Sequence, residues 1–204
     1  GEICRSLPPT SFIRPVLELA RGGYYALDSQ YFKDYYSRIV ETVNQKAASV
    51  NLGGALHKVK STENSRLIMA LSAIGKDATS VGNWDLIKPY STQGMKWITK
   101  QGINGPIFAL IALDTHNYPT TDTTIRQQCV DYILDKELAG GWALIVTAAD
   151  PDITAMALQA LVNYKDQSEV AAAAERAFAK LSAIQKDNGG YASWGSVNSE
   201  SIAQ

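Results

Sequence analysis

The chain has 204 residues, of which 46% are hydrophobic and 19% are charged. Its 19 Lys and Arg residues nearly balance its 20 Asp and Glu residues, giving a formal net charge of −1. This composition excludes an intrinsically disordered chain, and the balanced charge argues against a nucleic-acid partner, which would require clustered basic residues. Because no apolar run approaches the roughly 20 residues of a membrane-spanning helix, we expect no membrane span.

One-sided amphipathic helices are predicted at intervals along the chain. Their ranges are 31–48, 85–101, 125–138 and 169–185. In the third of them Ile125, Cys129 and Ile133 recur at helical spacing and form a single apolar stripe. Glycine pairs follow the first, third and fourth, at 53–54, 140–141 and 189–190. We expect these glycines to end each helix in the left-handed conformation.

A second kind of helix alternates with the first and is apolar on nearly every side. Such stretches are predicted at 67–75, 107–113 and 155–161, with a weaker copy at 11–20 and a further one beginning at Ile202. Helices that are apolar all round are buried. Ser, Thr, Asp and Asn residues precede these stretches and are expected to cap them, while Pro106 and Pro151 suit a helix start.

The alternation predicts an all-α fold in which one-sided helices surround buried ones, an α/α toroid of helical hairpins about 50 residues long. We expect a single domain over residues 1–204 with about four hairpins, an incomplete barrel or horseshoe. Stacked repeats need neighbours to cover each buried face. We therefore predict a truncated domain with an exposed apolar edge and self-association through that edge.

A motif near the end of the chain points to a family. The run Arg176-Ala177-Phe178-x-x-Leu181-x-x-x-Gln185-x-x-x-Gly189-Gly190-Tyr191 resembles the Gln-Trp repeat of squalene–hopene and oxidosqualene cyclases. Residues 131–142, with Glu137 near the Gln position, and residues 96–101 resemble weaker copies. With the alternating helices, the chain from about residue 11 onward resembles the prenyltransferase/squalene-cyclase repeat superfamily of α/α toroids.

Three further runs, at 62–77, 101–107 and 150–159, resemble toroid modules of secreted or surface-attached Gram-positive bacterial proteins, which are generally without an assigned reaction. That resemblance implies a non-catalytic binding or structural module, located outside the cell or at its surface. The same toroid occurs in cobalamin carriers related to intrinsic factor and transcobalamin, which implies a small-molecule carrier as an alternative.

Another alternative is a class II terpene cyclase-like isomerase. These cyclases protonate an alkene with the central acid of an Asp-x-Asp-Asp motif, held protonated in an apolar cavity. Asp150-Pro151-Asp152-Ile153 stands at the matching place before a buried helix. The resemblance implies Asp152 as proton donor beside Asp150, although Ile153 replaces the last Asp. The competing interpretation is that both carboxylates cap a helix N-terminus.

If the starts of the buried helices converge at one end, polar side chains gather there around a cavity. Glu63 and Asn104 are the expected ligand-binding residues at that end. Trp142, Tyr191 and Trp194 lie near the glycine turns and are candidates for stabilising a cation, with core packing as the competing role of Trp142. The expected ligand is a small apolar molecule or a surface component.

No cofactor or metal is expected. Protein prenyltransferases of this superfamily bind zinc through Asp, Cys and His, but His57, His116 and Cys129 make no recognisable zinc motif. Whether Cys4 pairs with Cys129 is left open by the sequence.

Overall fold

The computed structural model describes residues 13–145, 148–193 and 196–197. The regular secondary structure of these residues is helical apart from two paired strands of two residues each, as the sequence predicts for an all-α protein. The α-helices are α2 (Ile13–Arg21), α3 (Gln30–Val50), α4 (Ser61–Ala73), α5 (Lys88–Thr92), α6 (Gly94–Ile98), α7 (Asn104–Asp114), α8 (Ile125–Asp135), α9 (Pro151–Leu161) and α10 (Ser168–Ile184). Two 3-10 helices, η2 (Thr99–Gln101) and η3 (Val162–Tyr164), and strands β1 (Ala192–Ser193) and β2 (Ser196–Val197) complete the list.

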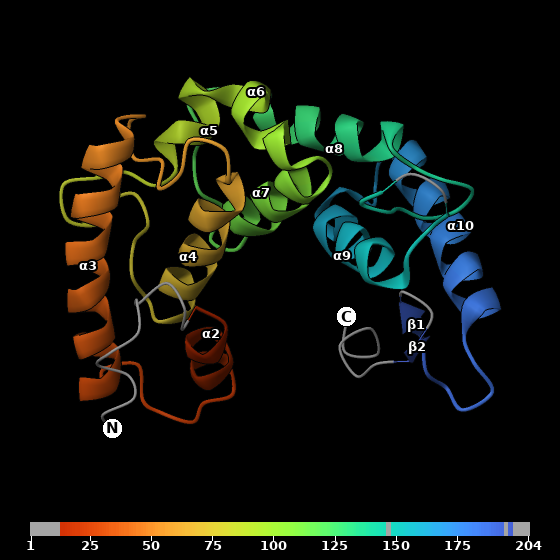
Figure 1. Cartoon of the computed structure of the whole chain (residues 1–204), viewed down its shortest axis with the longest axis horizontal. Coiled ribbons are helices and arrows are strands. Elements are labelled where there is room, and N and C mark those ends of the chain that lie inside the picture. The colour runs from red at the N-terminus through yellow and green to blue at the C-terminus, as the bar shows by residue number, and fades with distance from the viewer. Residues whose placement is uncertain (1–12, 146–147, 194–195, 198–204) are drawn as a thin grey trace.

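The helices form a two-layered arch (Figure 1). Helices α2, α4, α7 and α9 follow one another along its inner side, each packed on the next, while α3, α5, α6, α8 and α10 lie outside. Helix α8 packs on α7, and α10 packs on α9. The predicted alternation of buried and one-sided helices is therefore present in the fold. None of the helices in the described ranges is long and apolar enough to cross a bilayer.

The inner helices α4, α7 and α9 run in the same direction. The starts of α4 and α7 are in close contact. A Cβ atom built on Gly105 of α7 would lie 3.4 Å from Ser61 Oγ of α4. At their ends, Ser72 Oγ of α4 lies 2.9 Å from the hydroxyl of Tyr118, which follows α7. Tyr164, which follows α9, donates to Asp114 at the end of α7 across 3.0 Å. The starts of α4 and α7 thus lie side by side at one end of the inner layer. The ends of α4, α7 and α9 lie side by side at its opposite end.

The predicted helix over 85–101 is wrong as a continuous element. The structure divides it into α5, α6 and η2. Pro89 lies in the first turn of α5, a position that suits proline at the start of a helix. Gly94 has a φ of 57°, which interrupts the right-handed helical backbone between α5 and α6. Trp97 of α6 is nonetheless buried in the core.

The glycine pairs do not terminate the outer helices as predicted. Helix α3 ends on Asn51, with a φ of 54°, whose N–H donates to the Ala47 carbonyl. Gly53 and Gly54 follow in the turn, where a Cβ on Gly54 would collide with the backbone carbonyl of Asp85. These glycines are therefore required by the left-handed turn and by the close approach of a second chain segment.

Of the inner helices whose starts are described, α4, α7 and α9, only α9 has the predicted side-chain cap. Asp150 caps α9, but Lys60 and Ile103 stand at the cap positions of α4 and α7 without a side-chain hydrogen bond. The polar residues that were expected to cap α4 lie inside its first turns and are buried. The predicted inner helix beginning at Ile202 lies outside the described residues.

Candidate functional site

The Asp150 carboxylate holds the start of α9. Its Oδ1 accepts hydrogen bonds from the backbone N–H groups of Asp152, at 3.0 Å, and Ile153, at 3.1 Å. The Asp150 backbone also donates to the Trp142 carbonyl at 2.8 Å. This arrangement is a helix N-cap, in which a carboxylate satisfies two N–H groups that the helix leaves unpaired.

Asp152 stands in the first turn of α9 and is partly buried. Its Oδ1 is buried and accepts no hydrogen bond from the described residues. Leaving a buried carboxylate oxygen unpaired is costly, and the N-terminal dipole of α9 offsets part of that cost. Of the two acids predicted from the sequence, Asp152 is the one with an unsatisfied oxygen.

Trp142 belongs to the core. Its side chain is fully buried and its Nε1 donates to the Ile133 carbonyl of α8 at 2.7 Å. Its backbone N–H donates to Thr154 Oγ1 of α9 at 3.0 Å. A Cβ on the preceding Gly141 would come within 2.7 Å of the same Thr154 oxygen. Of the two interpretations of Trp142, the structure favours packing between α8 and α9.

The other predicted ligand-binding residues are not brought together into one described cavity. Glu63 pairs with Lys46 of α3 at 3.1 Å, with both side chains partly exposed. Asn104, at the start of α7, is partly buried, and its Oδ1 is buried without a hydrogen bond from the described residues. Tyr191 is partly exposed after the last glycine pair, and Trp194 lies outside the described residues.

Sequence reasoning missed a buried polar network at the start of α4. Asn64 accepts from the Leu56 N–H at 2.8 Å and donates to the carbonyls of Gly54, at 3.0 Å, and Leu86, at 3.2 Å. Ser65 and Tyr90 share a hydrogen bond of 2.7 Å, and burial raises the pKa of the Tyr90 hydroxyl. Asn64 thereby satisfies loop backbone groups that would otherwise be unpaired in the interior, while Ser65 and Tyr90 satisfy each other.

Gln residues of the motif copies hold turns in the same way. Gln101 Oε1 accepts from the Thr62 hydroxyl at 2.9 Å, which joins η2 to the first turn of α4. Gln185 donates to the Gly189 carbonyl at 3.0 Å and so ties the end of α10 to the glycine turn after it. Arg176 forms a two-pronged pair with Glu137, with both contacts at 2.7 Å. Of these motif residues, Gln101 and Arg176 thus join segments that are distant in the chain, whereas Gln185 holds a local turn.

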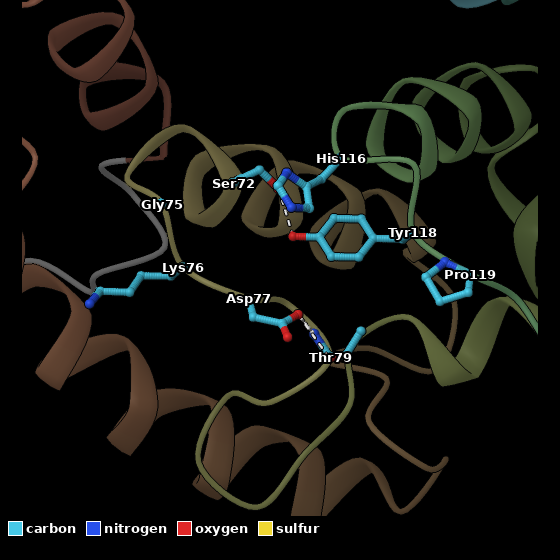
Figure 2. A pocket seen from close by; sticks show the side chains of 8 residues that line it. All are labelled: Ser72, Gly75, Lys76, Asp77, Thr79, His116, Tyr118 and Pro119. Atoms are coloured by element: carbon cyan, nitrogen blue, oxygen red, sulfur yellow. Dashed lines mark hydrogen bonds between the residues drawn. The ribbon is translucent and has the colours of Figure 1, made fainter.

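A cavity of about 360 Å³ lies at the opposite end of the inner layer (Figure 2). It is lined from the end of α4 and the segment after it by Ser72, Gly75, Lys76, Asp77 and Thr79, and from the segment after α7 by His116, Tyr118 and Pro119. The ligand site predicted from the sequence lies at the other end, where the buried helices start. The sequence feature that points to this cavity is the Asp-x-Thr turn at 77–79, which follows shortly after an inner helix.

The described residues contain no group of three or more His, Cys, Asp or Glu side chains arranged to hold a metal ion. Cys129 is a free, buried thiol, whose Sγ lies 3.7 Å from Met95 Sδ. Comparison of the chain with protein-family models, with curated proteins and with solved structures found no match. The resemblance to α/α toroids therefore stays a prediction from the sequence motifs.

Proposed function

We propose that the chain is a non-catalytic binding or structural module of the α/α-toroid type, belonging to a larger extracellular or surface protein. The observation that carries this proposal is the use of Asp150 as the N-cap of α9. The Asp150 Oδ1 atom accepts the backbone N–H groups of Asp152 and Ile153, as an N-cap does. An oxygen occupied by two backbone N–H groups is not available to orient the proton of a neighbouring acid.

The surroundings of Asp150 support the same conclusion. A carbocation-forming enzyme needs an apolar cavity lined by aromatic faces. Trp142, the aromatic residue nearest in sequence, is fully buried and held by Ile133. Asn64, Ser65 and Thr62 at the start of α4 have hydrogen-bond partners within the fold. The polar groups near these helix starts thus serve chiefly to hold the repeats together.

A class II cyclase-like isomerase is the second candidate, and one observation favours it. Asp152 Oδ1 is buried and unpaired among the described residues, as an acid kept for proton donation would be. Loss of the last Asp of the motif to Ile153 weighs against this function because the flanking carboxylate is missing.

The two candidates are separated by incubating the chain with squalene and with shorter polyprenyl substrates. We expect no cyclised product by mass spectrometry, with the wild type and the Asp152→Asn variant alike. The matched control is Asp131→Asn, which changes an exposed carboxylate on α8. Product that forms with the wild type and with Asp131→Asn, but not with Asp152→Asn, would overturn the non-catalytic proposal.

A further inference from the structure

The cavity at the ends of α4 and α7 is built by two matching helix ends. Gly75 after α4 and Asn117 after α7 both adopt left-handed conformations, with φ of 70° and 47°. In each case the next N–H turns back to a carbonyl five residues earlier, from Lys76 to Leu71 and from Tyr118 to Leu113, both at 2.8 Å. This is the Schellman type of helix ending, and it directs both following segments toward the same cavity (Figure 2).

The aromatic wall of the cavity is fixed in place. Ser72 Oγ donates to the Ile68 carbonyl at 2.8 Å, so the Tyr118 hydroxyl must be the donor in their 2.9 Å hydrogen bond. The Tyr118 oxygen in turn accepts from the Ala78 N–H at 3.3 Å. Because its hydroxyl is bound to Ser72 and Ala78, the Tyr118 ring needs little reordering when a ligand binds, which favours affinity.

Two polar groups at the cavity remain available to a ligand. Asp77 Oδ1 accepts from Thr79 N and Thr79 Oγ1, both at 2.8 Å. Asp77 Oδ2 and the His116 imidazole, by contrast, take part in no hydrogen bond with the described residues, and both side chains are exposed. The His116 ring lies 5.5 Å from the Tyr118 ring at an angle of 43°, so the two rings form a corner beside the carboxylate.

The charge at this end of the arch favours a cation. The last turns of α4 and α7 present the negative ends of their helix dipoles, and Asp77 adds a carboxylate. Lys76 extends away from the gap between Asp77 and Tyr118 (Figure 2), and its ammonium group lies 5.0 Å from the centre of the Tyr36 ring. Asp114 is already paired with Arg126 at 2.8 Å.

We propose that this cavity binds a small molecule carrying a primary ammonium group, with Asp77 as its charge partner and the His116 imidazole as a second acceptor. A primary ammonium has three N–H donors, which suits a cavity whose lining includes two free acceptors. The volume of about 360 Å³ falls within the range of small-molecule sites. The proposal rests on the binding role proposed above and names the ligand class.

The test is an NMR titration of the isotopically labelled 204-residue chain with ethanolamine, and with ethylene glycol as its uncharged counterpart. We expect saturable shifts of the Asp77, Thr79 and Tyr118 amides with ethanolamine, at a dissociation constant on the order of millimolar, and none with ethylene glycol. Asp77→Asn keeps an acceptor for Thr79 but removes the charge, and it should weaken binding about tenfold. His116→Ala should weaken it less.

Asp122→Asn is the matched control, because Asp122 makes the same turn with Thr124 after α7 but does not line the cavity. It should leave the titration unchanged. Equal shifts with ethylene glycol, equal affinity in Asp77→Asn, or no saturable shift would each overturn the ammonium site. None of these results would contradict the proposal of a non-catalytic module, because the incubation with squalene and polyprenyl substrates tests that proposal separately.

Discussion

Asp150 shows how one side chain can satisfy a local and a tertiary requirement together. Its carboxylate pairs two N–H groups of α9, while its backbone joins α9 to the Trp142 segment. Asp152, two residues later, has a buried oxygen with no partner among the described residues. The two acids therefore differ in their contribution to folding, although both stand at the start of α9.

We expect Asp150→Ala to lower the free energy of unfolding by about 1 kcal/mol, because α9 loses its N-cap. Asp150→Asn keeps an oxygen acceptor and should lose only a fraction of that amount. Urea denaturation followed by circular dichroism measures both. Asp152→Ala is the comparison, with an expected loss smaller than that of Asp150→Ala. Equal losses at the two positions would contradict the capping role of Asp150.

Cys129 is an inert thiol in the folded chain. Burial raises its pKa to about 12, and the nearby Asp114 carboxylate adds to the rise. We expect Cys129 in a Cys4→Ser variant to react with a thiol reagent at pH 8 only as fast as the chain opens, since the thiolate is the reactive form. Reaction without denaturant as fast as reaction in denaturant would contradict this.

The raised pKa of Cys129 also predicts a loss of stability in alkali. The unfolded thiol ionises near its ordinary value of 9.0, whereas the folded thiol holds its proton to about 12. The unfolded state therefore loses protons first, and stability falls as pH rises from 9 toward 12. Burial raises the pKa of Tyr35, Tyr90 and Tyr164 in the same direction. Thermal melts at pH 8 and pH 10.5 should show a lower Tm at the higher pH, and an unchanged Tm would contradict the prediction.

At the scale of elements, the end of α7 is the junction of three helices. Asp114 accepts from Arg126 of α8 at 2.8 Å and from Tyr164 of η3 at 3.0 Å. Arg126 also donates to the carbonyls of Leu113, at 3.0 Å, and Tyr118, at 2.7 Å. The Asp114 and Arg126 side chains are only 12% and 21% exposed, so solvent screens their attraction weakly.

Asp114→Ala should lower the free energy of unfolding by about 2 kcal/mol, because it leaves a mostly buried guanidinium and a tyrosine hydroxyl short of an acceptor. The matched control is Asp135→Ala, which breaks the exposed pair with Lys136. Such surface pairs contribute about 0–1 kcal/mol. Urea denaturation of both variants measures the difference, and a loss in Asp114→Ala no greater than that in Asp135→Ala would contradict the junction.

At the scale of the whole molecule, the arch leaves apolar side chains in water near α9 and α10. Ile145 is 70% exposed, Phe178 is 63% exposed and Val162 is 57% exposed. Phe178 stands in the Gln-Trp-like motif, yet the described residues do not cover it. Exposed apolar groups of this size, when they gather on one face, favour association between molecules.

We expect the chain to self-associate as its concentration rises, because an exposed apolar edge favours contact between molecules. Phe178→Glu should shift the association to higher concentration, because it replaces an exposed apolar side chain with a charged one. Val59→Glu changes an exposed apolar residue before α4 and is the control. Sedimentation velocity over a hundredfold range of protein concentration measures the effect. A monodisperse monomer throughout would contradict the prediction.

Periodic apolar residues and the cap at Asp150 act within a few neighbouring residues, so the sequence predicts most of the helices and the alternation of buried with one-sided ones. Which polar groups find partners inside the fold depends instead on contacts between distant segments. Asn64 reaches Leu86, 22 residues away, and Tyr118 receives the Ala78 N–H from 40 residues away. The break at Gly94, by contrast, has a local cause, the positive φ of that glycine, which the apolar spacing of the segment does not reveal. The cavity joins segments 72–79 and 116–119 because parallel inner helices end side by side, which no local pattern encodes.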